Sequence, residues 1–234
     1  MTGKKLDKPQ YCCEFCKRSF FNEKVLINHS CEKKRRWFKR DEPANRLAFM
    51  AWFRFYELND FNGQKKSTSY MDFIYSPYYT AFVKFGKHII DINASEPAKF
   101  IDFVLKNNLP IDKWTYDFVY EQYIRELIKK ETPEQALERM ILLMQQWSMQ
   151  TDERWQDFFR KINTNLAIQW IRAGRISPWL LYNLDSALDM IDRCTPEQQR
   201  MIGEFAPVGP WKLRFKKNTE AIEWIKTTMK QAGV

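Results

Sequence analysis

The sequence predicts a mainly α-helical protein, with an all-α helical bundle over residues 41–234 behind a short cysteine-rich segment. From Asp41 onward, apolar residues recur at the three- and four-residue spacing of amphipathic helices. Hydroxyl or acidic residues followed closely by proline mark several helix starts. Aromatic residues make up 16% of the chain and there are only 7 glycines, a composition typical of a well-packed globular protein. At 234 residues, the chain can hold one ordinary domain and a small appendage.

Start signals and apolar faces place the expected helices. Thr132-Pro133 and Thr195-Pro196 each put a hydroxyl at the N-cap and proline at the first helical position. Gln135 and Gln198 stand where they complete a capping box. We expect helices at 47–58, 70–75, 78–90, 95–107, 115–130, 133–149, 152–173, 178–193 and 219–231, with a break near Asn163, and a polar loop at 64–69.

One late segment interrupts this helical pattern. Residues 203–210 are expected to form a loop, and apolar and basic residues then alternate over Trp211–Lys217. Alternation predicts a strand with three large apolar groups on one face and cations on the other. The cations are candidates for a second nucleic-acid contact: Lys212, Arg214, Lys216 and Lys217. The alternative is a strand that packs its apolar face on the bundle and leaves its cations in solvent.

The cysteine-rich segment carries the most specific pattern. Six residues of ligand or apolar type define it: Tyr11, Cys13, Cys16, Phe20, Leu26 and His29. This spacing resembles the C2H2-type zinc finger over about 20 residues of the chain. The resemblance implies a ββα unit at residues 11–32 whose fold depends on Zn²⁺, with the cysteine pair on a β-turn and a helix after it.

The fourth ligand departs from that family. It normally follows the first histidine by three to five residues, whereas the nearest candidate here, Cys31, follows His29 by two. Two residues apart on a continuous helix, the side chains would point roughly 200° apart. Cys31 therefore ligates only if the helix ends or tightens at Asn28 or His29. The alternatives are His88, Cys194 and Cys12.

Positive charge is concentrated at the N-terminus. Residues 1–40 contain 12 Lys or Arg and 4 Asp or Glu, a net charge of +8 out of +9 for the whole chain. We expect a basic arm at 1–10 and a basic linker at 33–40, and such a bias is typical of phosphate binding. The candidate contacts in the linker are Lys33, Lys34, Arg35, Arg36, Lys39 and Arg40. Trp37 and Phe38 either stack on bases or dock on the helical domain.

Specific base reading has weaker support. The helix positions that face base edges in the resembled family correspond to Asn22, Val25 and Asn28, with Lys24 beside them. Lys24 and Asn28 remain candidate contacts, but Val25 and the nearby Ile27 offer no hydrogen bond. Apolar groups on the outer face favour a second interpretation, in which the finger docks on a protein.

Catalytic patterns are weak. One of the two histidines is assigned to the metal, and His88 remains as the only imidazole base. The sequence has no glycine-rich phosphate loop, nucleophile elbow or cysteine redox pair outside the finger. We therefore expect a binding protein and not an enzyme. A metal-dependent nuclease built from Asp91, Asp102 and Asp112 is the less favoured alternative.

The cellular location can also be predicted from the sequence. The apolar runs are too short to span a bilayer and no secretory signal is apparent, so we expect an intracellular protein of the cytoplasm, nucleoid or nucleus.

The aromatic- and lysine-rich helical domain resembles replication or transcription accessory proteins of large tailed phages. We expect a nucleic-acid-binding adaptor that prefers DNA to RNA and binds a partner protein through its helical domain. The alternative is a protein-interaction or structural component.

Overall fold

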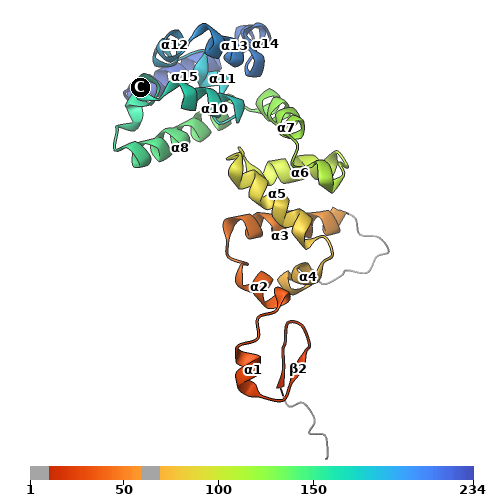
Figure 1. Cartoon of the computed structure of the whole chain (residues 1–234). Coiled ribbons are helices and arrows are strands. Elements are labelled where there is room, and N and C mark those ends of the chain that lie inside the picture. Colours follow the sequence, from red (N-terminus) through yellow and green to blue (C-terminus); the bar gives the residue numbers. More distant parts are fainter. Residues whose placement is uncertain (1–10, 59–68) are drawn as a thin grey trace, which may run out of the picture. The chain divides into compact units, whose positions relative to one another are not determined.

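The computed structural model describes residues 11–58 and 69–234, and these are mainly helical, as the sequence predicts (Figure 1). The expected arm at 1–10 and most of the expected loop at 64–69 lie outside the described residues. One sheet is present in the described part of the chain, an antiparallel pair of β1 (Tyr11–Cys12) and β2 (Ser19–Phe20). None of the helices in residues 11–58 and 69–234 has the length and apolar character needed to cross a membrane.

The helices fall into two compact units. Unit 1 takes in the residues up to Asp91 together with Val104–Thr115, and unit 2 takes in Ile92–Phe103 together with Tyr116–Val234. The helices that lie in unit 1 are α1 (Glu23–Ile27), α2 (Glu32–Phe38), α3 (Pro43–Leu58), α4 (Tyr70–Tyr75) and α5 (Tyr79–Asp91). Helix α6 (Pro97–Lys106) contributes residues to both units. Unit 2 continues with α7 (Asp117–Lys130), α8 (Pro133–Thr151), α9 (Phe158–Lys161), α10 (Thr164–Arg172), α11 (Pro178–Leu181), α12 (Asp185–Asp192), α13 (Pro196–Phe205), α14 (Val208–Lys216) and α15 (Thr219–Gln231).

In unit 1, α3 and α5 pack closely around Gly86. A Cβ atom at this position would collide with the carbonyl oxygen of Ala44, so only glycine allows the two helices to approach this far. Aromatic rings fill the space beside the crossing. Phe82 and Phe85 both meet Trp114 edge-on, with ring centroids 5.7 and 5.0 Å apart. Such contacts add to the stability gained from burial.

Unit 2 contains a buried ion pair among its helices. Glu131, only 4% exposed, accepts hydrogen bonds from Arg139 at 2.8 and 2.6 Å and from the Ser177 hydroxyl at 2.6 Å. Arg139 also donates to the carbonyl oxygens of Gly174 and Arg175. Because every charged group in this network has a partner within the protein, the burial of the pair is compensated.

The two expected Thr-Pro helix starts are confirmed, whereas the expected start at 152 is wrong because Asp152 is the left-handed C-cap of α8. Thr132 and Thr195 each form a capping box with the glutamine three residues later. The expected break near Asn163 is also present, because Asn163 is the N-cap of α10. The expected helix at 178–193 is instead two helices, since α11 ends at Leu181 and α12 begins at Asp185.

The expected strand at Trp211–Lys217 is wrong. These residues belong to helix α14 and its C-cap, and the expected loop before them is reduced to the turn between α13 and α14. In a helix, Trp211 and Phe215 share one face, where their rings pack on each other with centroids 5.4 Å apart. Both rings also contact Trp179. Leu213, which a strand would place beside them, is 65% exposed.

Candidate metal centre

The cysteine pair lies on a turn between the two strands. Tyr11 pairs with Phe20 in the antiparallel register, and the amide of Cys13 donates to Arg18 O at 2.9 Å. The amide of Lys17 donates back to Cys13 O at 2.8 Å, and Lys17 has a left-handed backbone with φ 60°. This tight turn brings the side chains of the cysteine pair to the same side.

The other half of the site comes from the end of one helix and the start of the next. Helix α1 ends at Ile27 with Asn28 as its C-cap, so His29 lies outside the helix. Cys31 has an extended backbone and is the N-cap of α2, where its sulfur accepts a hydrogen bond from Lys34 N at 3.4 Å. The break between the helices removes the roughly 200° separation that a continuous helix would impose on these two side chains.

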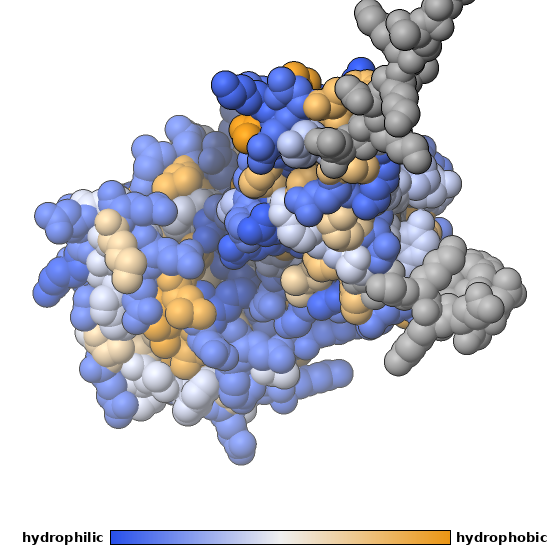
Figure 2. All heavy atoms as spheres, turned by 90° about the horizontal axis from the view of Figure 1, so that it is seen from below, coloured by the Kyte–Doolittle hydropathy of each residue, from blue (hydrophilic) through white to orange (hydrophobic). Residues whose placement is uncertain are grey.

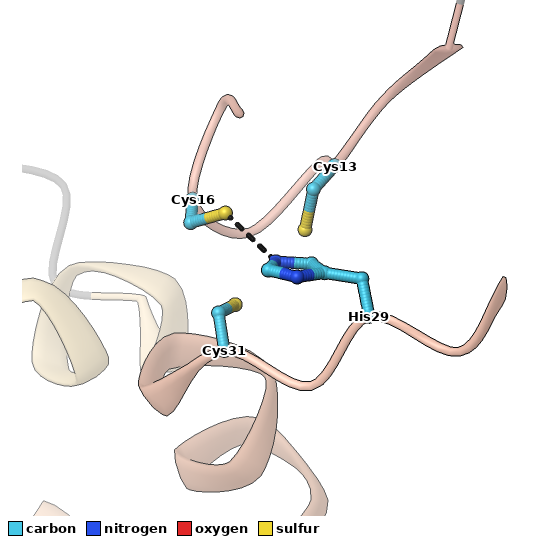
Figure 3. Close-up of side chains that lie close together, drawn as sticks. All are labelled: Cys13, Cys16, His29 and Cys31. Carbon is cyan, nitrogen blue, oxygen red and sulfur yellow. Dashed lines mark hydrogen bonds between the residues drawn. The ribbon is translucent and has the colours of Figure 1, made fainter. Parts of the chain in front are cut away.

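The four side chains converge on a common point (Figure 3). The ligand atoms of Cys13, Cys16, His29 and Cys31 all lie within 4.8 Å of one another. Cys16 Sγ and His29 Nε2 are 3.2 Å apart. The structure therefore brings together all four residues that the sequence proposed as metal ligands.

The donor set fits a tetrahedral metal ion. With Zn–S bonds of about 2.3 Å and Zn–N bonds of about 2.0–2.1 Å, tetrahedral ligand atoms lie roughly 3.5–3.8 Å apart. The observed spacing is compatible with such a polyhedron after small adjustments. Sulfur and imidazole nitrogen are ligands that suit zinc, whereas calcium and magnesium prefer oxygen.

The thiols of the cluster influence one another. Burial acts to raise the pKa of Cys13, but hydrogen bonds from the backbone amides of Cys16 and Phe15 outweigh it and leave the pKa lowered. A backbone hydrogen bond at Arg18 acts to lower the pKa of Cys16, yet burial and the neighbouring Cys13 and Cys31 sulfurs raise it overall. A bound cation removes this competition, because it stabilises all the thiolates together.

The segment around the cluster has almost no apolar core. Within residues 11–31, the buried residues are Cys13 and Phe15. Phe20 packs against the imidazole of His29 with ring centroids 4.8 Å apart, and Leu26 is half-buried. We call residues 11–31 the metal module, because they contain all four residues of the ligand cluster.

The alternative fourth ligands lie outside the cluster. Cys12 is exposed, and its thiol contacts the carbonyl oxygen of Cys13. Cys194 is buried in unit 2, where it donates to Met190 O at 3.4 Å. His88 is half-buried on α5. Neither these residues nor Asp91, Asp102 and Asp112 belong to a group of three or more potential ligands in the described parts of the chain.

The metal module docks on the rest of unit 1 through aromatic residues. Phe15 contacts the rings of Trp37 and Phe38, with centroids 6.1 and 6.5 Å apart. Trp37 in turn meets Tyr70 of α4 at 5.8 Å. The hydroxyl of Tyr75, also on α4, donates a hydrogen bond to Phe15 O. The prediction that Trp37 docks on the helical domain is therefore supported by contact, whereas Phe38 is 66% exposed.

Two cations of the expected linker are held by an internal acceptor. The linker is helix α2, and both Lys33 Nζ (3.0 Å) and Arg36 Nη1 (2.8 Å) donate to the carbonyl oxygen of Ile74 near the end of α4. Lys33 also lies over the ring of Tyr75, and Arg36 over that of Tyr79. Burial lowers the pKa of Lys33. Sequence reasoning missed this role because the acceptor is a main-chain atom about 40 residues away, which no local pattern reveals.

The other candidate cations of this region are more open. Lys24, Arg35 and Lys39 are exposed, and Lys39 makes only a 4.0 Å ion pair with Glu42. Asn28 is exposed at the end of α1. Lys34 donates to His29 O at 3.3 Å, and Arg40 lies over the ring of Trp37.

The candidates on α14 divide in the same way. Lys212, Lys216 and Lys217 are exposed. Arg214 instead lies against the rings of Trp179 and Trp211 and donates to three carbonyl oxygens at the end of α7, those of Ile128, Lys129 and Glu131. Its contacts are those of a residue that caps a helix C-terminus.

The metal module also exposes apolar side chains. Phe21 is 66% exposed, Val25 53% and Ile27 65%, and all three lie at or beside α1. Figure 2 looks from below Figure 1 and shows a mostly hydrophilic face with hydrophobic side chains in several small groups. The exposure of Val25 and Ile27 agrees with the outward apolar residues expected from the sequence.

Comparisons with known proteins found no match, whether with family models, curated proteins or solved structures. The function must therefore be argued from the geometry of this chain.

Proposed function

We propose that this protein is a nucleic-acid-binding adaptor whose metal module is folded by a structural zinc ion. The observation that carries the zinc assignment is the convergence of three thiols and one imidazole within 4.8 Å. Four protein ligands close a tetrahedral site, and closed sites hold structural zinc, whereas catalytic sites keep a position open for water or substrate. Bound zinc supplies the folding energy that a segment with so few buried side chains lacks.

The exposed cations around the module support the nucleic-acid part of the proposal. Lys24, Arg35 and Lys39 are available to phosphates, and Lys17 and Arg18 on the strand-connecting turn are exposed as well. Lys33 and Arg36 are assigned a structural role, since both hold the end of α4. DNA is the ligand we propose. It would be bound mainly through its phosphates, because Asn22 is engaged as the N-cap of α1 and Val25 offers no hydrogen bond to a base.

A salt titration tests this proposal. Binding of the zinc-loaded protein to duplex DNA, single-stranded DNA and RNA is measured at several salt concentrations. The Arg35→Gln and Lys39→Gln double variant should weaken binding and reduce the slope of log K against log salt by about 0.9 per lost phosphate contact on duplex DNA. Lys226→Gln with Lys230→Gln, two exposed changes on α15, is the matched control. An affinity that depends neither on salt concentration nor on Arg35 and Lys39 would contradict the proposal.

A second candidate function is supported by the exposed apolar residues of the module. Phe21, Val25 and Ile27 offer a surface suited to a protein partner, since large exposed apolar groups gathered in one place are typical of interaction sites. Under this alternative, the zinc ion shapes a protein-docking surface instead of a phosphate-binding one.

One pair of variants separates the two functions. Val25→Ser with Ile27→Ser leaves the charge unchanged and removes the apolar surface, whereas Arg35→Gln with Lys39→Gln does the reverse. The first pair should leave DNA binding within about twofold if phosphate contacts dominate. Two results together would favour the docking function. The first variant would lose a co-purifying protein, and the nuclease-treated parent protein would bind no added DNA.

A further inference from the structure

Unit 2 carries a groove that the metal module does not explain. It has a volume of about 910 Å³ and lies against α7, α10 and α13. A second hollow of about 250 Å³ continues it, because the two share Glu121, Gln169 and Arg172. Most of the residues that line the two hollows come from α13, α10 and the first two turns of α7.

The groove joins an apolar floor to an acidic rim. Ile168 and Phe205 line it, together with Met201, which is 39% exposed. Three glutamates, Glu121, Glu197 and Glu204, line the larger hollow, and Asp117 lines the smaller one. Against these four acids the two hollows contain one cation, Arg172. The groove is therefore acidic on a chain whose net charge is +9.

Its walls are tied together by hydrogen bonds. Gln198 Nε2 on α13 donates to Asn165 Oδ1 at 2.7 Å and to Thr164 Oγ1 at 3.3 Å, both at the start of α10. The same residue completes the capping box of α13. Walls joined in this way preform the groove, which lowers the entropy cost of binding.

We propose that this groove docks a basic amphipathic segment of a partner protein. The acidic rim selects lysine or arginine and repels phosphates, and the apolar floor requires aliphatic side chains between them. A single divalent cation fits less well, because these carboxylates form no group of three or more converging ligands. The proposal identifies the partner-binding surface of the adaptor and rests on that proposed function, but it does not depend on the metal module.

Arg172 acts as an internal competitor for the incoming cation. Its guanidinium is 3.6 Å from Glu121 and lies over the ring of Phe205 at 5.4 Å. Its side chain is 57% exposed, so the ion pair is partly open to water and is easily exchanged. A partner lysine or arginine that takes Glu121 must displace Arg172, and removal of Arg172 should therefore strengthen docking.

The test uses the full-length zinc-loaded protein and a fluorescent synthetic helix with leucine and lysine at three- and four-residue spacing. Glu197→Gln and Glu204→Gln should each weaken binding by about two- to fivefold, the range of a partly exposed ion pair. Met201→Ser should weaken it as well, and Arg172→Gln should tighten it. Glu223→Gln, on the exposed side of α15, makes the same charge change away from the groove and should have no effect.

Three results would overturn the proposal. The first is no binding of the peptide, and the second is equal binding by the parent protein and all groove variants. The third is equal binding of a peptide that has serine in place of leucine, since the surface would then attract any polycation. Thermal unfolding of each variant separates lost docking from lost structure. DNA binding measured on the same variants should not change, so failure of the DNA-binding proposal is recognised independently.

Discussion

The metal module and unit 2 differ in what stabilises them. Within residues 11–31, Cys13 and Phe15 are the buried residues, at 4% and 8% exposed. Unit 2 buries large rings throughout, among them Phe158, Phe159 and Trp179, each no more than 1% exposed. Burial of one such side chain contributes roughly 1.5–3 kcal/mol, so unit 2 is held by an apolar core. The module lacks that core, and we propose that a metal ion bound by its ligand cluster stabilises it instead.

A polar cluster taken from each region shows a second difference, which concerns charge balance. Glu131 and Arg139 neutralise each other, and their remaining hydrogen-bonding groups have partners in unit 2. The cluster of the metal module consists instead of three cysteines and one histidine, which are residue types that hold structural zinc. The first cluster is complete without a ligand, whereas the second offers a site for a metal ion, and we propose that this ion fixes its geometry.

The largest expected effect is the loss of the metal ion. Cys13→Ser should abolish stoichiometric zinc, since apparent zinc contributions in isolated finger peptides are about 10–16 kcal/mol. Amide hydrogen exchange should rise across residues 11–31 and stay unchanged in α8 and α10. Mass spectrometry of proteolytic peptides measures the exchange in both of these regions.

Cys12→Ser is the matched control, because Cys12 is exposed one residue away and lies outside the ligand cluster. This variant should keep its zinc and its exchange pattern. Equal loss of zinc from both variants would show that the ligand set is assigned wrongly.

The next effect belongs to unit 2. Arg139→Met leaves the carboxylate of Glu131 buried without its partner and should cost about 3–5 kcal/mol of unfolding free energy in urea titrations. The zinc content should not change. Arg154→Met removes an exposed pair with Asp157 and should have little effect, and a similar loss from both variants would argue against a special role for the buried pair.

A smaller effect tests the close packing of α3 and α5 around Gly86. Gly86→Ala places a methyl group against the carbonyl of Ala44 and should cost about 1–3 kcal/mol, as overpacking does. Gly203→Ala on α13 adds the same methyl group in open space and should stabilise by about 0.5–1 kcal/mol. Urea titrations measure the free energy of unfolding of both variants. A change of the same sign in the two would contradict this account of α3 and α5.

The smallest effect concerns the contact between the module and α4. Tyr75→Phe removes the hydrogen bond to Phe15 O and should cost about 1 kcal/mol. Zinc should be lost to a chelator slightly faster, as followed with a metal-sensitive dye. Tyr78→Phe, an exposed neighbour, is the comparison, and identical chelation rates in both variants would mean that the module is not held through Tyr75.

Local features of the fold were predictable from the sequence. The capping boxes at Thr132 and Thr195 and the break at Asn163 rest on residues close in the chain, and the structure contains all three. The four clustered ligands were also predictable, since their spacing is local. Helix α14 was not, because its alternating residues fit a strand and only packing of Trp211 and Phe215 on distant Trp179 favours a helix.

The candidate binding residues show the same limit. Lys33, Arg36 and Arg214 look like phosphate ligands in the sequence, but each donates to main-chain carbonyls at the end of another helix. Charge alone does not reveal such an acceptor, because it exists only after the chain has folded. The proposed phosphate contacts therefore narrow to cations such as Arg35 and Lys39 that the fold leaves exposed.

The position of Trp37 gives the protein an internal optical reporter. Its indole lies between Phe15 of the metal module and Tyr70 of α4. Any change that shifts the module alters the polarity around this ring, and tryptophan emission responds to polarity. The difference between spectra of the parent protein and Trp37→Phe should therefore isolate a signal that follows zinc loading without an added dye.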